Sequence, residues 1–154
     1  LRLAIPGITF STDIIVGFPG ETDAQFEETL SLVTEADFDD AYTFKYSVRE
    51  GTPAVRLQDH VAAEVASYRL ARLIEVVRLN ARRKNAARVG EVHEALVERP
   101  AKRGGLMLAR TRGNHLVLLD VPPDAAGGYR RVRLTGTTGS TFTGAVVEPA
   151  LAVL

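Results

Sequence analysis

Two short stretches of the chain place polar side chains where an apolar strand pattern ends. In the first, the carboxylate of Asp13 lies within a β-branched apolar run that stops at Gly17. The second, rich in aromatic residues, finishes on three side chains with polar ends, those of Lys45, Tyr46 and Ser47. Parallel α/β folds bind their ligands at the carboxyl ends of the strands. The two stretches therefore predict one ligand site to which both strands contribute.

The elements that must position these residues follow the order strand, helix, strand. Strands are predicted at residues 8–16 and 41–47, and the first is apolar on both faces, which predicts a strand covered on both sides. Between them, Thr22 and Gln25 form a capping box that begins a helix reaching to about residue 36. This order predicts a βαβ unit with parallel strands. The apolar stripe of the helix is expected to contain Phe26, Leu30 and Val33.

A long helix is predicted over about residues 61–88, with Asp59 as its N-cap. Its length, about 40 Å at 1.5 Å per residue, suits a connector between two bodies. From Arg78 to Arg88 this helix carries five basic residues and no acidic ones. Its apolar face is assigned to Val61, Val65, Leu73, Ile74 and Val77.

From Gly90 onward, short β runs alternate with turns that are rich in glycine and proline. Five short strands in about 60 residues predict a small closed or nearly closed barrel of the oligonucleotide-binding type. The strands are expected near residues 91–98, 106–112, 115–120, 129–137 and 141–148.

Composition excludes several kinds of site. The chain has no cysteine, so none of its residues forms a disulfide, a thiolate metal site or a ligand to an iron-sulfur cluster. The three histidines, His60, His93 and His115, lack metal-ligand spacing, and no metal is assigned to them. No stretch is long and apolar enough to span a membrane, and no signal peptide or initiator methionine begins the chain. A cytoplasmic, truncated protein that does not bind membranes is expected.

The net charge of zero hides a division along the chain. Residues 1–60 carry 4 basic and 11 acidic residues, whereas residues 61–154 carry 15 basic and 8 acidic ones. A basic half indicates either a nucleic-acid interface or a solvated surface. Because only Tyr129 and Phe142 are aromatic beyond position 100, shape and charge rather than base contacts are expected to dominate any recognition of nucleic acid. The predicted contacts to the nucleic-acid backbone are Arg82, Arg83, Lys84, Lys102, Arg103, Arg110 and Arg112.

Three segments, taken in order, resemble the radical SAM tRNA methylthiotransferases of the MiaB type: residues 11–22, 41–54 and 110–114. The resemblance implies that residues 1–88 are the C-terminal part of a partial (β/α)6 radical SAM barrel, including a connecting helix at about 59–88. It implies that residues 89–154 are a five-stranded TRAM RNA-binding domain. The CxxxCxxC triplet of that family is absent from the chain. No catalytic residue is therefore assigned, and the fragment alone is expected to be inactive.

The resemblance also implies cofactors and a substrate. Members of the family cleave S-adenosylmethionine and add a methylthio group to C2 of N6-isopentenyladenosine, next to the anticodon of tRNA. Two 4Fe-4S clusters would be ligated by cysteines outside this chain, and the anticodon stem-loop would be the partner. Ile15 and Gly17 match positions that border the adenine in this family. The cofactor-binding set is taken as Asp13, Ile15, Gly17, Lys45, Tyr46 and Ser47.

Other interpretations remain open at this point. Gly17 also suits a simple turn, and Lys45 could pair with an acidic neighbour or contact a carboxylate or a phosphate. Asp13 must pair with a cation, face a polar interior or hydrogen-bond at a strand end. A ribosomal-protein aspartate methylthiotransferase of the RimO type and a non-catalytic RNA-binding module are the alternative functions. A barrel cut in the middle exposes a sheet edge, which favours self-association.

Overall fold

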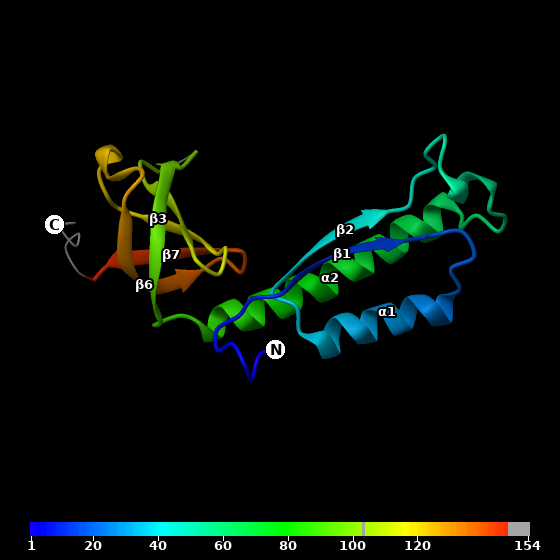
Figure 1. Cartoon of the computed structure of the whole chain (residues 1–154), viewed down its shortest axis with the longest axis horizontal. Coiled ribbons are helices and arrows are strands. Elements are labelled where there is room, and N and C mark those ends of the chain that lie inside the picture. The colour runs from blue at the N-terminus through cyan, green and yellow to red at the C-terminus, as the bar shows by residue number, and fades with distance from the viewer. Residues whose placement is uncertain (103, 148–154) are drawn as a thin grey trace. The chain divides into compact units, whose positions relative to one another are not determined.

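The computed structural model describes residues 1–102 and 104–147, and its chain divides into two compact units (Figure 1). The α/β unit comprises Phe10–Ala81. The barrel unit comprises Leu1–Thr9 and the described residues from Arg82 onward. None of the described helices is both long and apolar enough to cross a bilayer.

The α/β unit contains the expected βαβ arrangement. Strands β1 (Ser11–Val16) and β2 (Asp40–Lys45) are parallel and in register over six residue pairs, and helix α1 (Asp23–Ala36) connects them. A short 3₁₀ helix, η1 (Pro53–Arg56), follows β2. One face of β1 is more exposed than the other, because exposed residues alternate along it with partly buried ones and the strand ends on the buried Val16. The prediction that this strand is covered on both sides is therefore wrong for the chain as it stands.

Helix α1 begins with the predicted capping box. The backbone N–H of Gln25 donates to Thr22 Oγ1 at 3.3 Å, and the N–H of Thr22 donates to Gln25 Oε1 at 3.0 Å. These two bonds satisfy donors that a helix start leaves unpaired. The expected apolar stripe is buried and packs with Val16 and Leu73 as the core of the unit. Its members are Phe26, Leu30 and Val33.

Helix α2 (Ala63–Ala87) begins later than predicted, and Asp59 is not its N-cap. Asp59 instead adopts a left-handed backbone (φ 60°), and its carbonyl accepts the N–H of Gly20 at 2.9 Å. Val65, which the sequence places on the buried face, is 39% exposed. In this first turn Ala66 is buried instead, because one position along a helix turns a side chain by about 100°. The prediction is confirmed for Leu73, which is fully buried, and for Val77, which packs against the core.

The barrel unit is a closed five-stranded β-barrel of the predicted oligonucleotide-binding type, with strand order β3-β4-β5-β7-β6. All pairs are antiparallel except β5 with β7, and β3 closes the barrel against β6. A 3₁₀ helix, η2 (Pro123–Ala125), precedes β6. The strands begin and end within two residues of the predicted ranges, except that residue 148 lies outside the described residues. Their bounds are β3 Val92–Pro100, β4 Met107–Thr111, β5 Leu116–Leu119, β6 Tyr129–Thr137 and β7 Thr141–Val146.

The barrel has its own core of inward-facing side chains. Val97, Val117 and Phe142 are fully buried within it. Glycine at position 144 allows β7 to pack closely in the barrel, since a Cβ at this position would lie 2.8 Å from Val117 Cγ1. The last turns of α2 belong to this unit, and Asn85 Nδ2 donates to the carbonyl of Gly139 at 2.8 Å.

Candidate ligand cavity and nucleic-acid interface

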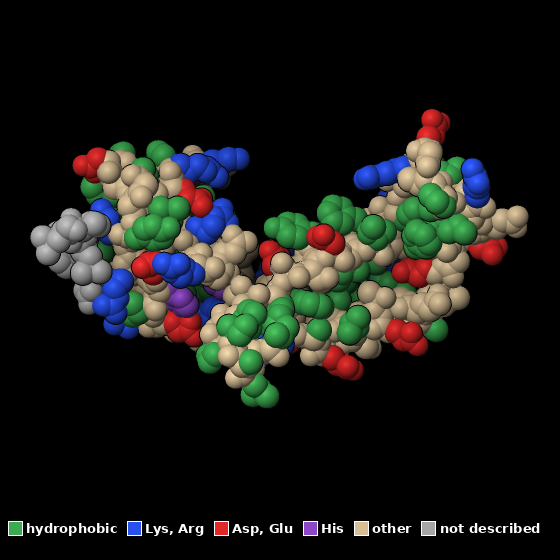
Figure 2. Space-filling model, viewed as in Figure 1, with side chains coloured by type: hydrophobic (Ala, Val, Ile, Leu, Met, Phe, Trp, Pro, Cys, Tyr) green, Lys and Arg blue, Asp and Glu red, His purple; other side chains and the backbone are tan. Residues whose placement is uncertain are grey.

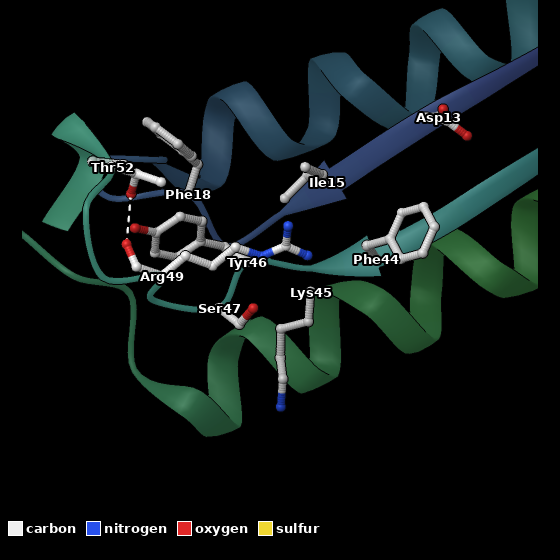
Figure 3. A pocket seen from close by; sticks show the side chains of 10 residues that line it. Asp13, Ile15, Phe18, Phe44, Lys45, Tyr46, Ser47, Arg49 and Thr52 are labelled. Atoms are coloured by element: carbon white, nitrogen blue, oxygen red, sulfur yellow. Dashed lines mark hydrogen bonds between the residues drawn. The ribbon is translucent and has the colours of Figure 1, made fainter.

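A cavity of about 490 Å³ lies at the carboxyl ends of β1 and β2 and under the loop that follows β2 (Figure 3). This volume falls within the range of about 300–1,000 Å³ that small-molecule sites occupy. Five of the six predicted cofactor-binding residues line it, and Gly17 does not. The lining residues are Asp13, Ile15, Phe18, Phe44, Lys45, Tyr46, Ser47, Arg49, Thr52 and Ala54.

The apolar part of the cavity comes from the uncovered face of the sheet. Ile15 and Phe44 are partners in the β1–β2 register and are 56% and 51% exposed. Phe18 lies edge-on to Tyr46, with ring centroids 5.1 Å apart. Figure 3 shows Ile15 and Phe44 on the two neighbouring strands, with Phe18 and Tyr46 beyond the strand ends. Such a wall suits the flat face of a heteroaromatic ring.

Three side chains of the cavity, those of Asp13, Arg49 and Tyr46, make no ion pair or side-chain hydrogen bond within the described residues. Among the described residues, neither the Asp13 carboxylate nor the Arg49 guanidinium makes an ion pair. The hydroxyl of Tyr46 is buried and has no hydrogen-bond partner in the described part of the chain. Buried polar atoms in folded proteins are nearly always hydrogen-bonded.

Lys45 contributes its stem rather than its charge to the cavity. Its Nζ donates to Ser67 Oγ on α2 at 3.0 Å, and the side chain points toward that helix in Figure 3. The hydroxyl of Ser67 in turn donates to the carbonyl of Ala63 at 2.7 Å. The ammonium of Lys45 therefore links the end of β2 to α2. Of residues 45–47, Ser47 is the exposed residue whose polar group lines the cavity.

Gly17 shapes the turn behind the cavity and is not part of its lining. Its backbone is left-handed (φ 74°), and a Cβ there would lie 2.6 Å from Ala66 Cβ on α2. The left-handed backbone and the close approach of Ala66 both disfavour any residue other than glycine at this position. The N–H of Gly17 donates to Glu21 Oε2 at 2.7 Å.

Sequence reasoning missed Arg69, which lies on α2 and is only 4% exposed. Its Nη1 donates to Glu21 Oε2 at 2.6 Å and to the Glu21 carbonyl at 3.0 Å, and its Nη2 donates to Asp23 Oδ1 at 2.6 Å. The hydrogen bond to Asp23 and the interactions with Glu21 raise the pKa of Arg69 above its usual value, against the opposing effect of burial. The available signal was an arginine three residues after Ala66 and four before Leu73, within an apolar stripe.

In the barrel unit, the two arginines of the predicted motif at 110–114 are held by acidic partners on β3. Arg110 Nε donates to Glu98 Oε1 at 2.6 Å, and Arg112 pairs with Glu94 at 2.5 Å. Arg112 nevertheless keeps a 79% exposed side chain. Its guanidinium lies 6.0 Å from the ring of Tyr129, a cation–π geometry.

Two further arginines, missed from the sequence, lie on the same outer face. In β6 the inward residues are Val132 and Leu134, so Arg131 and Arg133 alternate with them and face outward. The β3–β6 register places Arg131 opposite Glu94. Tyr129 begins this strand and is 56% exposed. Figure 2 shows basic side chains over the barrel and hydrophobic ones exposed over the strands of the α/β unit.

The remaining predicted RNA contacts are dispersed within the barrel unit. The stem of Arg82 packs on the β6–β7 turn, where a Cβ on Gly139 would lie 2.7 Å from Arg82 Cγ. Arg83 and Lys84 both interact with other residues, and Lys102 is exposed in the β3–β4 turn. Arg103 lies outside the described residues. In the described part of the chain, no three His, Asp or Glu side chains come together as a metal site.

Comparison with known proteins places this geometry in context, although no family model matches the chain. Three relatives share the name tRNA-2-methylthio-N(6)-dimethylallyladenosine synthase. The one from Opitutus terrae is 44% identical over 94% of this chain and 30% of its own length. The one from Geobacillus kaustophilus is 47% identical over 99% of this chain and 29% of its own length. The one from Clostridium botulinum is 43% identical over 94% of this chain and 32% of its own length. The chain thus spans about 30% of the length of the relatives that it matches.

Proposed function

We propose that this chain, which belongs to the radical SAM tRNA methylthiotransferases of the MiaB type and corresponds to their C-terminal part, supplies two binding functions to a longer enzyme. In this proposal, the α/β unit is the end of the radical SAM barrel and the barrel unit is the TRAM domain. The parent enzyme would methylthiolate C2 of N6-isopentenyladenosine beside the tRNA anticodon, in the cytoplasm. The fragment alone would bind tRNA without turnover.

The observation that carries the cofactor assignment is the open cavity with unpartnered polar groups. Ile15, Phe18 and Phe44 offer an apolar wall for an adenine ring, and the Arg49 guanidinium suits a carboxylate. The orphaned hydroxyl of Tyr46 indicates a missing hydrogen-bond partner. The residues therefore fit S-adenosylmethionine, which supplies a 5′-deoxyadenosyl radical when it is bound and reduced. This chain's own residues would hold the nucleoside and exclude water from it.

The iron-sulfur clusters do not fit residues of this chain. Thiolates are the usual cluster ligands, and the sequence has no cysteine. We therefore assign both clusters to cysteines elsewhere in the parent protein, and the part of this chain is confined to binding the nucleoside and the RNA.

A binding experiment on the longer parent enzyme tests the cavity. Ile15→Glu puts a carboxylate into the apolar wall at an exposed position, where it leaves the fold intact. We expect calorimetric binding of S-adenosylhomocysteine to weaken by at least about 10-fold, since a charge would be buried against the ring. The matched variant Leu32→Glu, on an exposed position of α1 outside the cavity, should bind normally. Unchanged binding by Ile15→Glu would remove the cavity from the cofactor site.

For tRNA, the outer face of β6, β3 and β4 is the proposed contact surface. This outer face carries Arg110, Arg112, Arg131 and Arg133 beside the exposed ring of Tyr129. Phosphate contacts give an affinity that falls steeply with salt. Filter binding of an anticodon stem-loop should therefore weaken with salt, and the double change Arg110→Glu with Arg112→Glu should reduce both affinity and salt slope. An affinity that does not change with salt concentration would contradict the assignment of this surface to RNA binding.

We also propose that the isolated chain self-associates through the uncovered sheet face. Tyr42 and Phe44 are 54% and 51% exposed there, beside Ile15. Exposed apolar patches of this kind favour association. Sedimentation should detect a concentration-dependent dimer that Phe44→Lys weakens. A chain that stays monomeric at high concentration would refute this proposal.

A further inference from the structure

A buried arginine holds the turn that forms one wall of the cavity. Arg69 is 4% exposed, and all the hydrogen bonds of its guanidinium go to Glu21 and Asp23, at the start of α1. The ring of Phe26 covers the guanidinium, 5.6 Å from Arg69 Cζ. A buried charge needs such a set of partners, because removal of any partner leaves it uncompensated.

The hydrogen bonds continue from Arg69 to the cavity wall. The same Glu21 oxygen that accepts from Arg69 Nη1 at 2.6 Å also accepts the N–H of Gly17 at 2.7 Å. Phe18, the next residue, lines the cavity and contacts Tyr46. One helical turn before Arg69, Ala66 packs where a Gly17 side chain would stand. Helix α2 thus fixes the turn at two points, one steric and one electrostatic.

A second arginine of α2 provides an internal comparison. Arg72 lies one turn later and pairs with Glu27 of α1 through both ends of its guanidinium. This pair also joins α1 to α2, but its side chains are 37% and 54% exposed. Neither residue lines the cavity, and the N–H of Gly17 is bonded to Glu21 instead. Arg72 also lies over the Phe26 ring, with its Cζ 5.4 Å from the ring centroid, but its hydrogen bonds go to Glu27 rather than to Glu21. It therefore represents helix pairing without the hydrogen-bonded link to the cavity wall.

We propose that Arg69 is a positioning residue for ligand binding: through the Glu21 carboxylate it sets the orientation of the Gly17–Phe18 wall against the flat ring of the ligand. The identity of that ligand as S-adenosylmethionine rests on the proposed function. Groups that orient a binding wall raise affinity by reducing the ordering needed on binding. Arg69 itself does not touch the ligand in this proposal.

The test measures ligand affinity and stability separately in the longer parent enzyme. S-adenosylhomocysteine is titrated by calorimetry, well below the melting temperature of each variant. Arg69→Gln should weaken binding about 10-fold, and Arg69→Lys should recover part of the loss, because it keeps the charge but not the fork. Glu21→Gln should also weaken binding, since it removes the charge shared by Arg69 and Gly17. The control Arg72→Gln should stay within about 2-fold of the parent.

The outcomes separate this inference from the cofactor assignment. If Arg69→Gln does not fold, Arg69→Lys and Glu21→Gln decide the question. The positioning role is overturned if all folded variants at Arg69 and Glu21 bind the probe with normal affinity. It is also overturned if Arg72→Gln loses as much affinity as Arg69→Gln, because that would reveal a general destabilisation. If the parent enzyme binds the probe and Ile15→Glu binds it equally well, the cofactor site itself is wrong. If the parent enzyme fails to bind the probe at all, both proposals fall.

Discussion

The two units of this protein differ in how completely each buries its sheet. In the barrel unit every strand has two neighbours, and inward side chains such as Val97 and Phe142 are fully buried. In the α/β unit two strands pair only with each other, and Ile15 and Phe44 remain half exposed. Closure removes unpaired edges, whereas a two-stranded sheet depends on its helices for stability. The comparison shows a barrel that closes its own sheet and an α/β unit that leaves one sheet face uncovered.

Charge is also used differently in the two units. In the α/β unit, Arg69 is buried and holds a turn in place. On the barrel, Arg112 remains 79% exposed although it pairs with Glu94. Exposed ion pairs contribute little to stability, and their cations can exchange one anionic partner for another at small cost. Buried arginine thus fixes a turn in the α/β unit, whereas exposed arginine on the barrel pairs with an acidic neighbour at the surface.

The largest expected effect is on the barrel core. Phe142→Ala should destabilise the barrel unit by about 3–5 kcal/mol, because it leaves a cavity where a fully buried ring packs edge-on to His115. The matched change Ile15→Ala, on the open face, should cost less than about 1 kcal/mol. Urea unfolding followed by circular dichroism measures both. Similar losses of unfolding free energy in the two variants would contradict the proposed difference between the closed barrel and the open sheet.

The next effect separates the two glycines of the β1–α1 turn. Gly17→Ala should cost about 2–4 kcal/mol, since it adds a clash with Ala66 to the strain of a left-handed backbone. Gly20 has a similar φ of 83° but open space around it, so Gly20→Ala should cost only about 1 kcal/mol. Thermal unfolding of the two variants gives the difference. Equal shifts would show that the packing of α2 behind the turn is unimportant.

A smaller effect concerns RNA affinity. Tyr129→Ala should weaken binding of an anticodon stem-loop by about 1–3 kcal/mol if a base stacks on the exposed ring beside Arg112. The salt slope should stay unchanged, because no phosphate contact is lost. Tyr129→Phe is the control and should bind normally. Loss of affinity in the control would point to the hydroxyl rather than to stacking.

The smallest effect tests the helix cap of the α/β unit. Thr22→Ala removes the oxygen that accepts the N–H of Gln25 and should cost about 1 kcal/mol. Thr22→Ser keeps that oxygen and should remain near the parent value. Chemical denaturation distinguishes the two. A neutral Thr22→Ala would mean that packing of Phe26 and Leu30 alone determines where α1 begins.

Local patterns sufficed for most of the elements. The capping box at Thr22, the stripe of α1 and the five barrel strands all follow from residues within one or two turns of each other, and the structure confirms them. The boundary and buried face of α2 were less predictable. The sequence around Asp59 resembles a cap, but tertiary contacts place that residue in a loop bonded to Gly20. Local propensity is weak compared with such contacts.

The sequence alone determined the alternation of elements, the basic character of the C-terminal half and the segments shared with the methylthiotransferases. Only the tertiary structure decided that Lys45 turns toward α2, that Arg69 is buried against Glu21 and that Arg110 and Arg112 face acidic residues of β3. These pairs join residues from 12 to 48 positions apart along the chain. Periodicity is a property of neighbours, whereas the partner of a charged side chain depends on which distant element folding brings beside it.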